Sequence, residues 1–313
     1  MDLAGIIPAT VTPMNADGAI EEDGLRRYIK WLLGYEGLKG LAVNMDTGEG
    51  PQMTRAERRR VLEVYVEEVS GRVPVLAGIG APSTAAAVDL ARDAADTGAD
   101  ALVVFPHPVF VGEPLPWRVP YAYHKAIADA ADLPMVIFQL QPALAGVIFS
   151  REALLKLASI PNVIAIKEAS FDAVQFAETV RVLSDAPKPI QILTGNDNFI
   201  LESFLLGADG ALIGFGTIAI AEQIEMVKRV RSDDLAGARQ LYDDVVQPLV
   251  SVTFAPPVRD YRARMKEALV ALGVLKAAHV RPPLLPLEPD EARAVLEAVQ
   301  RARLQVPSAV GEA

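Results

Sequence analysis

Residues 161–170 of the chain have the sequence Pro-Asn-Val-Ile-Ala-Ile-Lys-Glu-Ala-Ser. The apolar run begins after a proline and ends at polar residues, a pattern typical of a short buried strand. Lys167 ends this run, at a position where its ammonium group would be poorly solvated. Burial disfavours the charged form, so more of the amine is neutral and able to attack a carbonyl group to form a Schiff base. The alternative is a solvated lysine that pairs with a carboxylate such as Glu168.

Apolar runs of this kind recur along the chain. They lie at residues 5–10, 40–44, 73–78, 101–105, 134–139, 163–167, 189–194 and 210–214. The runs are almost continuously apolar, as expected for parallel strands that are covered on both faces. Helical patterns separate them, for example residues 84–97, behind the N-cap candidate Ser83, and residues 150–159. Eight strand–helix units predict the α/β class and, within it, a (β/α)8 or TIM barrel.

A doubly wound open sheet is the competing architecture. Its first turn usually carries the glycine-rich fingerprint of a dinucleotide site, whereas residues 12–15 here are Thr-Pro-Met-Asn. Residues 78–80, Gly-Ile-Gly, lack the third glycine of that fingerprint and follow the third run, so they indicate a turn. The barrel is therefore the favoured prediction.

The last part of the chain shows helical patterns and no strand signal. These patterns lie at residues 219–231, 235–250, 258–272 and 289–303, and residues 307–313 are expected to form a frayed tail. We expect residues 1–225 to form the barrel and residues 226–313 to form a helical bundle packed on it.

The composition narrows the class of function. The 313 residues carry a formal net charge of −10 and include no cysteine. The charge argues against a nucleic-acid partner, because phosphate contacts need basic patches. Without cysteine no disulfide or thiolate nucleophile is expected, and the histidines at 107, 124 and 279 are too scattered to predict a metal site. No apolar run approaches the ~18 residues that span a bilayer, and no signal-peptide pattern is visible, so we expect a cytoplasmic protein without a membrane partner.

In a barrel of this kind the chemistry takes place at the carboxyl ends of the strands. The predicted ends carry Asn44, Asp46, Thr47, Gly48, Glu49, His107, Phe138, Gln139, Lys167, Thr194, Gly195, Asn196, Asp197, Gly214 and Gly216. The hydroxyl of Thr47, with nearby N–H groups, suits a substrate carboxylate, although the same side chain could cap the next helix. Asp197 is suited either to bind substrate hydroxyl groups or to stabilise a turn.

Four short motifs lie at the predicted strands. They are Ala-Thr-Val-Thr-Pro at 9–13, Asp-Thr-Gly-Glu at 46–49, Ile-Lys-Glu-Ala-Ser at 166–170 and Gly-Asn-Asp at 195–197. In order and spacing they resemble the dihydrodipicolinate synthase / N-acetylneuraminate lyase family, and the resemblance covers nearly the whole chain. It implies a (β/α)8 barrel and Schiff-base chemistry on 2-oxo acids such as pyruvate, with no metal or organic cofactor. It also implies a homo-oligomer, a tetramer or a dimer.

The resemblance further implies roles for individual residues. Lys167 takes the position of the Schiff-base lysine, and Thr47 that of the threonine that helps to bind the carboxylate of the 2-oxo acid. Gly195 and Asp197 take the positions that contact the substrate tail in the sugar-acid lyases. Leu212, in the eighth predicted strand, is a further candidate for substrate binding.

The chain departs from the family at the proton relay. Phe138 stands where the family has the relay tyrosine, Asp46 where it has the first threonine of its motif, and Pro108 where the synthases have a second tyrosine. Residues 141–144 contain no counterpart of the arginine that binds the second substrate of the synthases. Imine formation still needs acid–base catalysis, so we expect Asp46 to move protons, unless it only caps the turn. His107 is the second candidate for that role.

The predicted function is that of a Schiff-base lyase, an aldolase or a dehydratase, that acts on pyruvate or a 2-oxo-3-deoxy sugar acid. Phe138 is expected to contact the substrate, and with Leu140 and Leu144 it would make the pocket wall apolar and favour a less charged substrate tail. Two alternatives stay open. One is a true dihydrodipicolinate synthase with an altered relay, and the other is a non-catalytic protein that binds 2-oxo acids.

Overall fold

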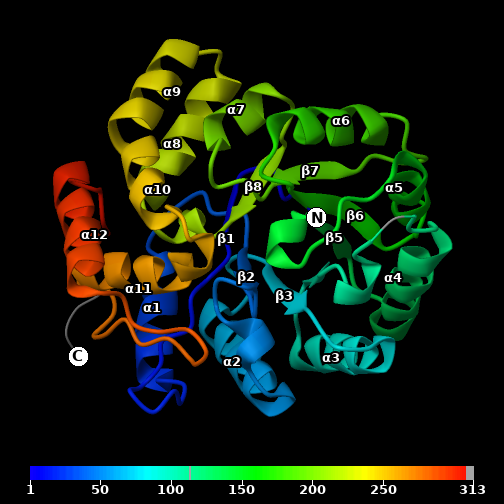
Figure 1. The fold of residues 1–313 in the computed structure, drawn as a ribbon, viewed down its shortest axis with the longest axis horizontal. Coiled ribbons are helices and arrows are strands. Elements are labelled where there is room, and N and C mark those ends of the chain that lie inside the picture. Colours follow the sequence, from blue (N-terminus) through cyan, green and yellow to red (C-terminus); the bar gives the residue numbers. More distant parts are fainter. Residues whose placement is uncertain (113, 308–313) are drawn as a thin grey trace.

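The computed structural model describes residues 1–112 and 114–307, and a sheet of eight parallel strands forms its centre (Figure 1). The strands are β1 (Ile6–Pro8), β2 (Leu41–Val43), β3 (Val75–Ile79), β4 (Ala101–Val104), β5 (Met135–Leu140), β6 (Val163–Ala169), β7 (Gln191–Thr194) and β8 (Gly210–Ile213). Their order in the sheet is β1-β8-β7-β6-β5-β4-β3-β2. Each predicted strand is confirmed, since each apolar run overlaps one of them, although β3, β5 and β6 extend one or two residues beyond their runs.

The first and second strands close the sheet into a barrel. Ala9, just after β1, forms a parallel bridge with Ala42 in β2. The N–H of Thr10 donates to the carbonyl of Ala42 at 3.0 Å, and the N–H of Lys39 donates to the carbonyl of Ile6 at 2.9 Å. With β1 and β2 joined in this way, the eight strands form the predicted (β/α)8 barrel.

The barrel interior is a packed apolar core rather than a channel. Each strand contributes a fully buried side chain to it: Ile7, Ala42, Leu76, Val103, Val136, Ala165, Leu193 and Leu212. Such layers of inward-pointing residues are typical of this fold. Nearer the carboxyl ends, Phe138 on β5 and Lys167 on β6 are register partners, and Lys167 is in turn the partner of Leu193 on β7. Register therefore places the phenyl ring beside the lysine side chain.

Helices cover the outside of the barrel. They are α1 (Glu22–Leu32), α2 (Arg55–Val69), α3 (Thr84–Thr97), α4 (Arg118–Ala131), α5 (Arg151–Ala158), α6 (Ala173–Leu183), α7 (Ile200–Leu205) and α8 (Ile220–Arg231), with 3₁₀ turns at Gly50–Gln52, Pro108–Phe110, Pro142–Leu144 and Phe215–Thr217. Ser83 and Ser150 cap α3 and α5 by accepting the N–H groups of Ala86 and Ala153, as the sequence predicts for Ser83. None of the described helices is long and apolar enough to cross a membrane.

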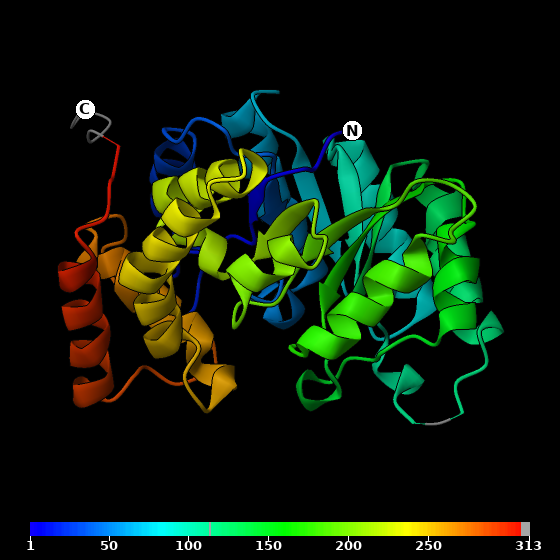
Figure 2. The same ribbon diagram turned by 90° about the horizontal axis from the view of Figure 1, so that it is seen from above.

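The C-terminal part of the chain is helical and lies at one side of the barrel in both views (Figures 1 and 2). It consists of α9 (Leu235–Leu241), a π-helical turn at Tyr242–Val246, α10 (Gln247–Thr253), a 3₁₀ turn at Val258–Asp260, α11 (Tyr261–Ala271) and α12 (Pro289–Ala302). The predicted helical extension is thus confirmed. Because α8 runs across residues 225 and 226, the domain boundary placed between them remains a prediction. Most of the predicted tail, residues 308–313, lies outside the described residues.

Candidate active site

A small cavity of about 40 Å³ lies at the carboxyl ends of the strands. Its lining consists of Asp46, Thr47, Phe138, Leu140, Leu144, Lys167, Ala169, Phe171, Gly195, Asp197, Gly214, Phe254, Val258 and Tyr261. The structure therefore brings together six of the seven predicted site residues. The apolar wall expected from Phe138, Leu140 and Leu144 is also present.

Lys167 is the buried amine of this cavity. The residue is 7% exposed, and its Nζ lies 4.1 Å from the centroid of the Phe138 ring. Burial lowers the pKa of Lys167 to about 8, while the nearby carboxylates of Asp197 and Asp46 act in the opposite direction. The ring partly replaces lost water around the cation through a cation–π contact. More of this lysine is neutral near pH 7 than of a solvated lysine, as a nucleophilic amine requires.

Lys167 does not form the ion pair with Glu168 that the alternative interpretation requires. Successive side chains of a strand point to opposite faces, so Glu168 points away from the barrel interior. Its Oε1 accepts hydrogen bonds from Gln139 Nε2 at 3.1 Å and from the N–H of Ser170 at 3.2 Å, and its Oε2 accepts one from Asn196 Nδ2 at 2.8 Å. The buried Glu168 therefore fixes the loops after β6 and β7 rather than the amine.

The residue after β7 has to be a glycine for Lys167 to occupy its position. A Cβ added to Gly195 would lie 2.8 Å from Lys167 Cε and 2.8 Å from Ala169 Cβ. Contacts below 3.0 Å cannot be accommodated without a shift of the neighbouring atoms. Gly195 thus acts on the lysine side chain, in addition to any contact with a substrate.

Asp197 places a second ionisable group in the cavity. Its Oδ1 accepts a hydrogen bond from the N–H of Phe215 at 2.8 Å, which ties the loop after β7 to the end of β8. Burial raises the pKa of Asp197 to about 7, against the opposing influence of the Lys167 ammonium group. The carboxyl group and the amine therefore influence each other's protonation in the region where a substrate would lie.

Asp46 contacts two residues from α11 that sequence reasoning did not select. The hydroxyl of Tyr261 donates to Asp46 Oδ2 at 2.9 Å and lies 3.4 Å from Thr47 Oγ1. Arg262 forms an ion pair with the same carboxylate and donates from Nε to the backbone carbonyl of Asp46 at 2.9 Å. Burial raises the pKa of Tyr261 well above its usual value, so the phenol stays protonated at rest. The C-terminal helices therefore complete the cavity.

Two predicted residues are not part of this arrangement. Leu212 belongs to the packed barrel interior, and the described lining of the cavity does not include it. Its position therefore does not support a contact with the substrate. His107 caps the 3₁₀ turn at Pro108–Phe110 by accepting the N–H of Val109 at 3.1 Å, and it too is outside the described lining. A proton-transfer role for His107 is therefore not supported.

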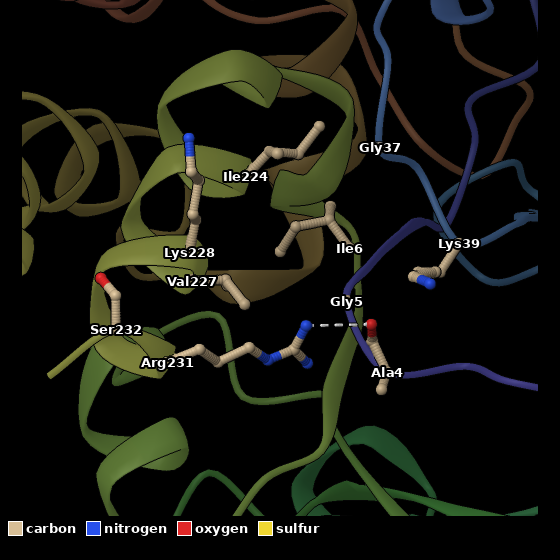
Figure 3. A pocket seen from close by; sticks show the side chains of 10 residues that line it. All are labelled: Ala4, Gly5, Ile6, Gly37, Lys39, Ile224, Val227, Lys228, Arg231 and Ser232. Carbon is tan, nitrogen blue, oxygen red and sulfur yellow. Dashed lines mark hydrogen bonds between the residues drawn. The ribbon is translucent and has the colours of Figure 1, made fainter.

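A larger cavity of about 290 Å³ opens at the opposite end of the barrel (Figure 3). It lies between the start of β1 and the last turns of α8, and its basic side chains have partners. Arg231 donates to the carbonyl groups of Ala4 and Asp209 at 3.2 and 2.6 Å, and Lys39 pairs with Asp2 at 2.7 Å. Active sites of (β/α)8 barrels lie at the carboxyl ends of the strands, so the cavity around Lys167 is the candidate site. In residues 1–112 and 114–307, no group of three or more histidine and carboxylate side chains is placed to hold a metal ion.

The fold and the cavity define a (β/α)8 barrel with a buried, deprotonatable lysine at its carboxyl-terminal face. The model of the dihydrodipicolinate synthetase family matches residues 2–302, and the chain belongs to this family. It is accordingly an enzyme of the Schiff-base lyase type.

Individual relatives agree with this assignment. The chain is 34% identical to the 4-hydroxy-tetrahydrodipicolinate synthase of Neisseria gonorrhoeae over 91% of its own length and 94% of that protein. Among solved structures, a prophage protein of the same family from E. coli K12, in complex with pyruvate, superimposes with a TM-score of 0.87 at 27% identity, covering 96% of this chain and 99% of that one. The synthase from Acinetobacter baumannii, also complexed with pyruvate, gives 0.85 at 28% identity, covering 97% and 100%.

Proposed function

We propose that this enzyme forms a Schiff base between Lys167 and pyruvate or another 2-oxo acid and then makes or breaks a bond next to the former carbonyl group. The observation that carries the proposal is the buried Lys167 amine, with its lowered pKa, in a cavity that also contains Thr47. Two solved relatives that bind pyruvate support the substrate class.

The imine step needs a neutral amine and a bound carboxylate. The Nζ of Lys167 attacks C2 of the 2-oxo acid, the resulting carbinolamine loses water, and a C=N bond replaces the C=O bond. The N–H groups of Gly48 and Glu49 already donate to the carbonyls of Met45 and Asp46 at 3.1 and 3.0 Å. We therefore assign the substrate carboxylate to the hydroxyl of Thr47. The protonated imine then withdraws electrons from the adjacent carbon, so the reaction needs no further cofactor.

Two substrate assignments have separate support. The relatives named 4-hydroxy-tetrahydrodipicolinate synthase, at 32–34% identity over most of the chain, favour that synthase activity. The apolar wall formed by Phe138, Leu140 and Leu144 instead favours an aldolase or dehydratase with a less charged second substrate. Activity assays with pyruvate plus aspartate semialdehyde, and with a panel of 2-oxo-3-deoxy sugar acids, distinguish these assignments. Binding without turnover in either assay would contradict both substrate assignments.

Borohydride trapping tests the imine directly. The protein is incubated with pyruvate, reduced with borohydride and analysed by mass spectrometry. We expect a stable adduct on the wild-type protein and none on Lys167→Ala. The matched control is Lys228→Ala, because Lys228 is 78% exposed on α8 and should leave the adduct unchanged. If no 2-oxo acid gave an adduct on the wild-type protein, the proposed function would be wrong.

A further inference from the structure

The cavity contains a hydroxyl group that comes from the C-terminal helical part. Tyr261, at the start of α11, is 6% exposed and lines the cavity with Lys167 and Phe138. Phe138, at the position expected for a relay tyrosine, has no exchangeable proton. We propose that Tyr261 is the proton-transfer residue of this site and that Asp46 is its relay partner. This inference rests on the imine chemistry proposed for Lys167.

The position of the phenol fits the reacting end of a 2-oxo acid. The Tyr261 hydroxyl lies 3.4 Å from Thr47 Oγ1, the group assigned to the substrate carboxylate. In a 2-oxo acid the carboxylate carbon is bonded directly to C2, the carbon that Lys167 attacks. A phenol beside Thr47 is therefore next to the oxygen on C2 that must gain a proton before it leaves as water.

The hydrogen bond to Asp46 gives the phenol a route for its proton. When a substrate hydroxyl gives its proton to the phenol oxygen, the proton of Tyr261 moves along the 2.9 Å hydrogen bond to Asp46 Oδ2. One O–H bond breaks and one forms at each transfer, so no charge or proton is lost. Run in reverse, the relay returns the proton from Asp46 through Tyr261 to the carbinolamine hydroxyl, which leaves as water. A relay of this kind contributes general acid–base catalysis.

Neighbouring groups hold the phenol in place. The ring of Phe254 stacks on that of Tyr261 with a centroid distance of 5.0 Å and an interplanar angle of 20°. Arg262, the next residue of α11, forms an ion pair with Asp46 and fixes the position of its carboxylate. A Cβ on Gly214 would lie 3.0 Å from Thr47 Oγ1 and 3.4 Å from Tyr261 Cε2, so a glycine at the end of β8 provides the room for both.

A buried ion pair anchors α11 to the loop that carries Asp46 and Thr47. Lys266 Nζ lies 2.5 Å from Glu49 Oε1, and both side chains are fully buried. Glu49 Oε2 accepts the N–H of Arg281 at 2.6 Å. The helix and the loop are thus joined at a point five residues along α11 from Tyr261, which restrains the distance between Tyr261 and Asp46.

Replacement of Tyr261 by phenylalanine tests the proposal, because it removes the hydroxyl and keeps the ring that stacks on Phe254. In Tyr261→Phe we expect kcat, and the rate of imine formation followed by rapid-quench borohydride trapping, to fall by about 10²–10⁴-fold. The adduct should still form on long incubation, and KM for the 2-oxo acid should change little, because binding does not need the proton relay. The double variant Phe138→Tyr/Tyr261→Phe should recover about tenfold or more of the lost rate, because it returns a phenol to the cavity from β5.

Tyr242→Phe is the matched control, since Tyr242 is a buried tyrosine of the C-terminal part outside the described lining of the cavity. Wild-type rates in Tyr261→Phe, or an equal loss in Tyr242→Phe, would overturn the proposal. If Tyr261→Phe fails to fold, Asp46→Asn replaces it, because an amide keeps the phenol in place but takes up no proton. A wild-type rate in Asp46→Asn would then overturn the proposal. The absence of any adduct on the wild-type protein would instead overturn the imine chemistry itself.

Discussion

The strand ends of the barrel and the first turn of α11 contribute to the same cavity in different ways. The barrel supplies Lys167 on β6, whose register fixes its position, and Thr47 and Asp197 from the loops after β2 and β7. The helix supplies Tyr261 and Arg262, which lie more than 200 residues from Asp46 in sequence and meet it only in the fold. The strand ends carry the proposed nucleophile and the proposed carboxylate site, and the helix carries the groups proposed to replace the missing relay. Part of the active-site chemistry in this barrel therefore lies in the C-terminal helices.

The largest effect of a substitution is expected where α11 is joined to the loop that carries Asp46 and Thr47. Lys266→Met removes one partner of the buried ion pair and leaves Glu49 with an uncompensated charge. Removal of one member of such a pair costs about 3–5 kcal/mol, so the free energy of unfolding, measured in urea, should fall by about that amount. The control Lys276→Met breaks a 3.8 Å contact of a side chain that is 73% exposed and should cost less than about 0.5 kcal/mol. Equal losses in the two variants would contradict the importance of this connection.

A substitution among the strand-end residues of the barrel should displace the Lys167 amine rather than lower the free energy of unfolding. Gly195→Ala places a methyl group 2.8 Å from Lys167 Cε and should displace the amine. A misplacement of this size costs on the order of 10²-fold in rate, which rapid-quench trapping with pyruvate would measure. Gly80→Ala is the control, because a Cβ at this other strand-end glycine would make only an ordinary contact, 3.4 Å from Phe105 Cγ. A normal rate of imine formation in Gly195→Ala would show that Lys167 has room to move.

The smallest effect is expected in the pH dependence of imine formation. The neutral amine of Lys167 accumulates as the pH rises through its pKa of about 8, so the rate should rise with pH and level off above that value. The Asp197 carboxylate raises this pKa, so Asp197→Asn should move the midpoint of the rate profile to lower pH. A midpoint near the ordinary lysine value of about 10.4, or a shift to higher pH, would contradict the proposed environment of the amine.

The barrel could be predicted from the sequence, because the patterns that indicate it are local. Each strand is a continuous apolar run of a few residues, and the count of such runs, with helical patterns between them, leaves few architectures open. The cavity residues of the barrel could be predicted for the same reason, since Lys167 ends the sixth apolar run and Thr47 lies three residues after the second run. The C-terminal helices were also visible as helical patterns.

Tyr261 could not be predicted from local patterns. It begins a helix that is rich in charged residues, and nothing within that segment indicates that its hydroxyl reaches a carboxylate in the loop after the second strand. The one indirect signal was Phe138, because the loss of a phenol at that position implies that another group moves the proton. The burial of Leu212 in the packed core could not be predicted for a related reason, since position within a strand does not tell how deep in the core a side chain lies.

A crystal structure of the protein after reaction with pyruvate and borohydride is the most direct test of a site shared between the barrel and α11. Continuous electron density is predicted from Lys167 Nζ to C2 of the pyruvate group, with its carboxylate at the Thr47 hydroxyl. The Tyr261 hydroxyl should lie within about 3.2 Å of a substrate oxygen or of a water molecule in its place. An unmodified Lys167, or a Tyr261 hydroxyl turned away from the trapped group, would contradict the account.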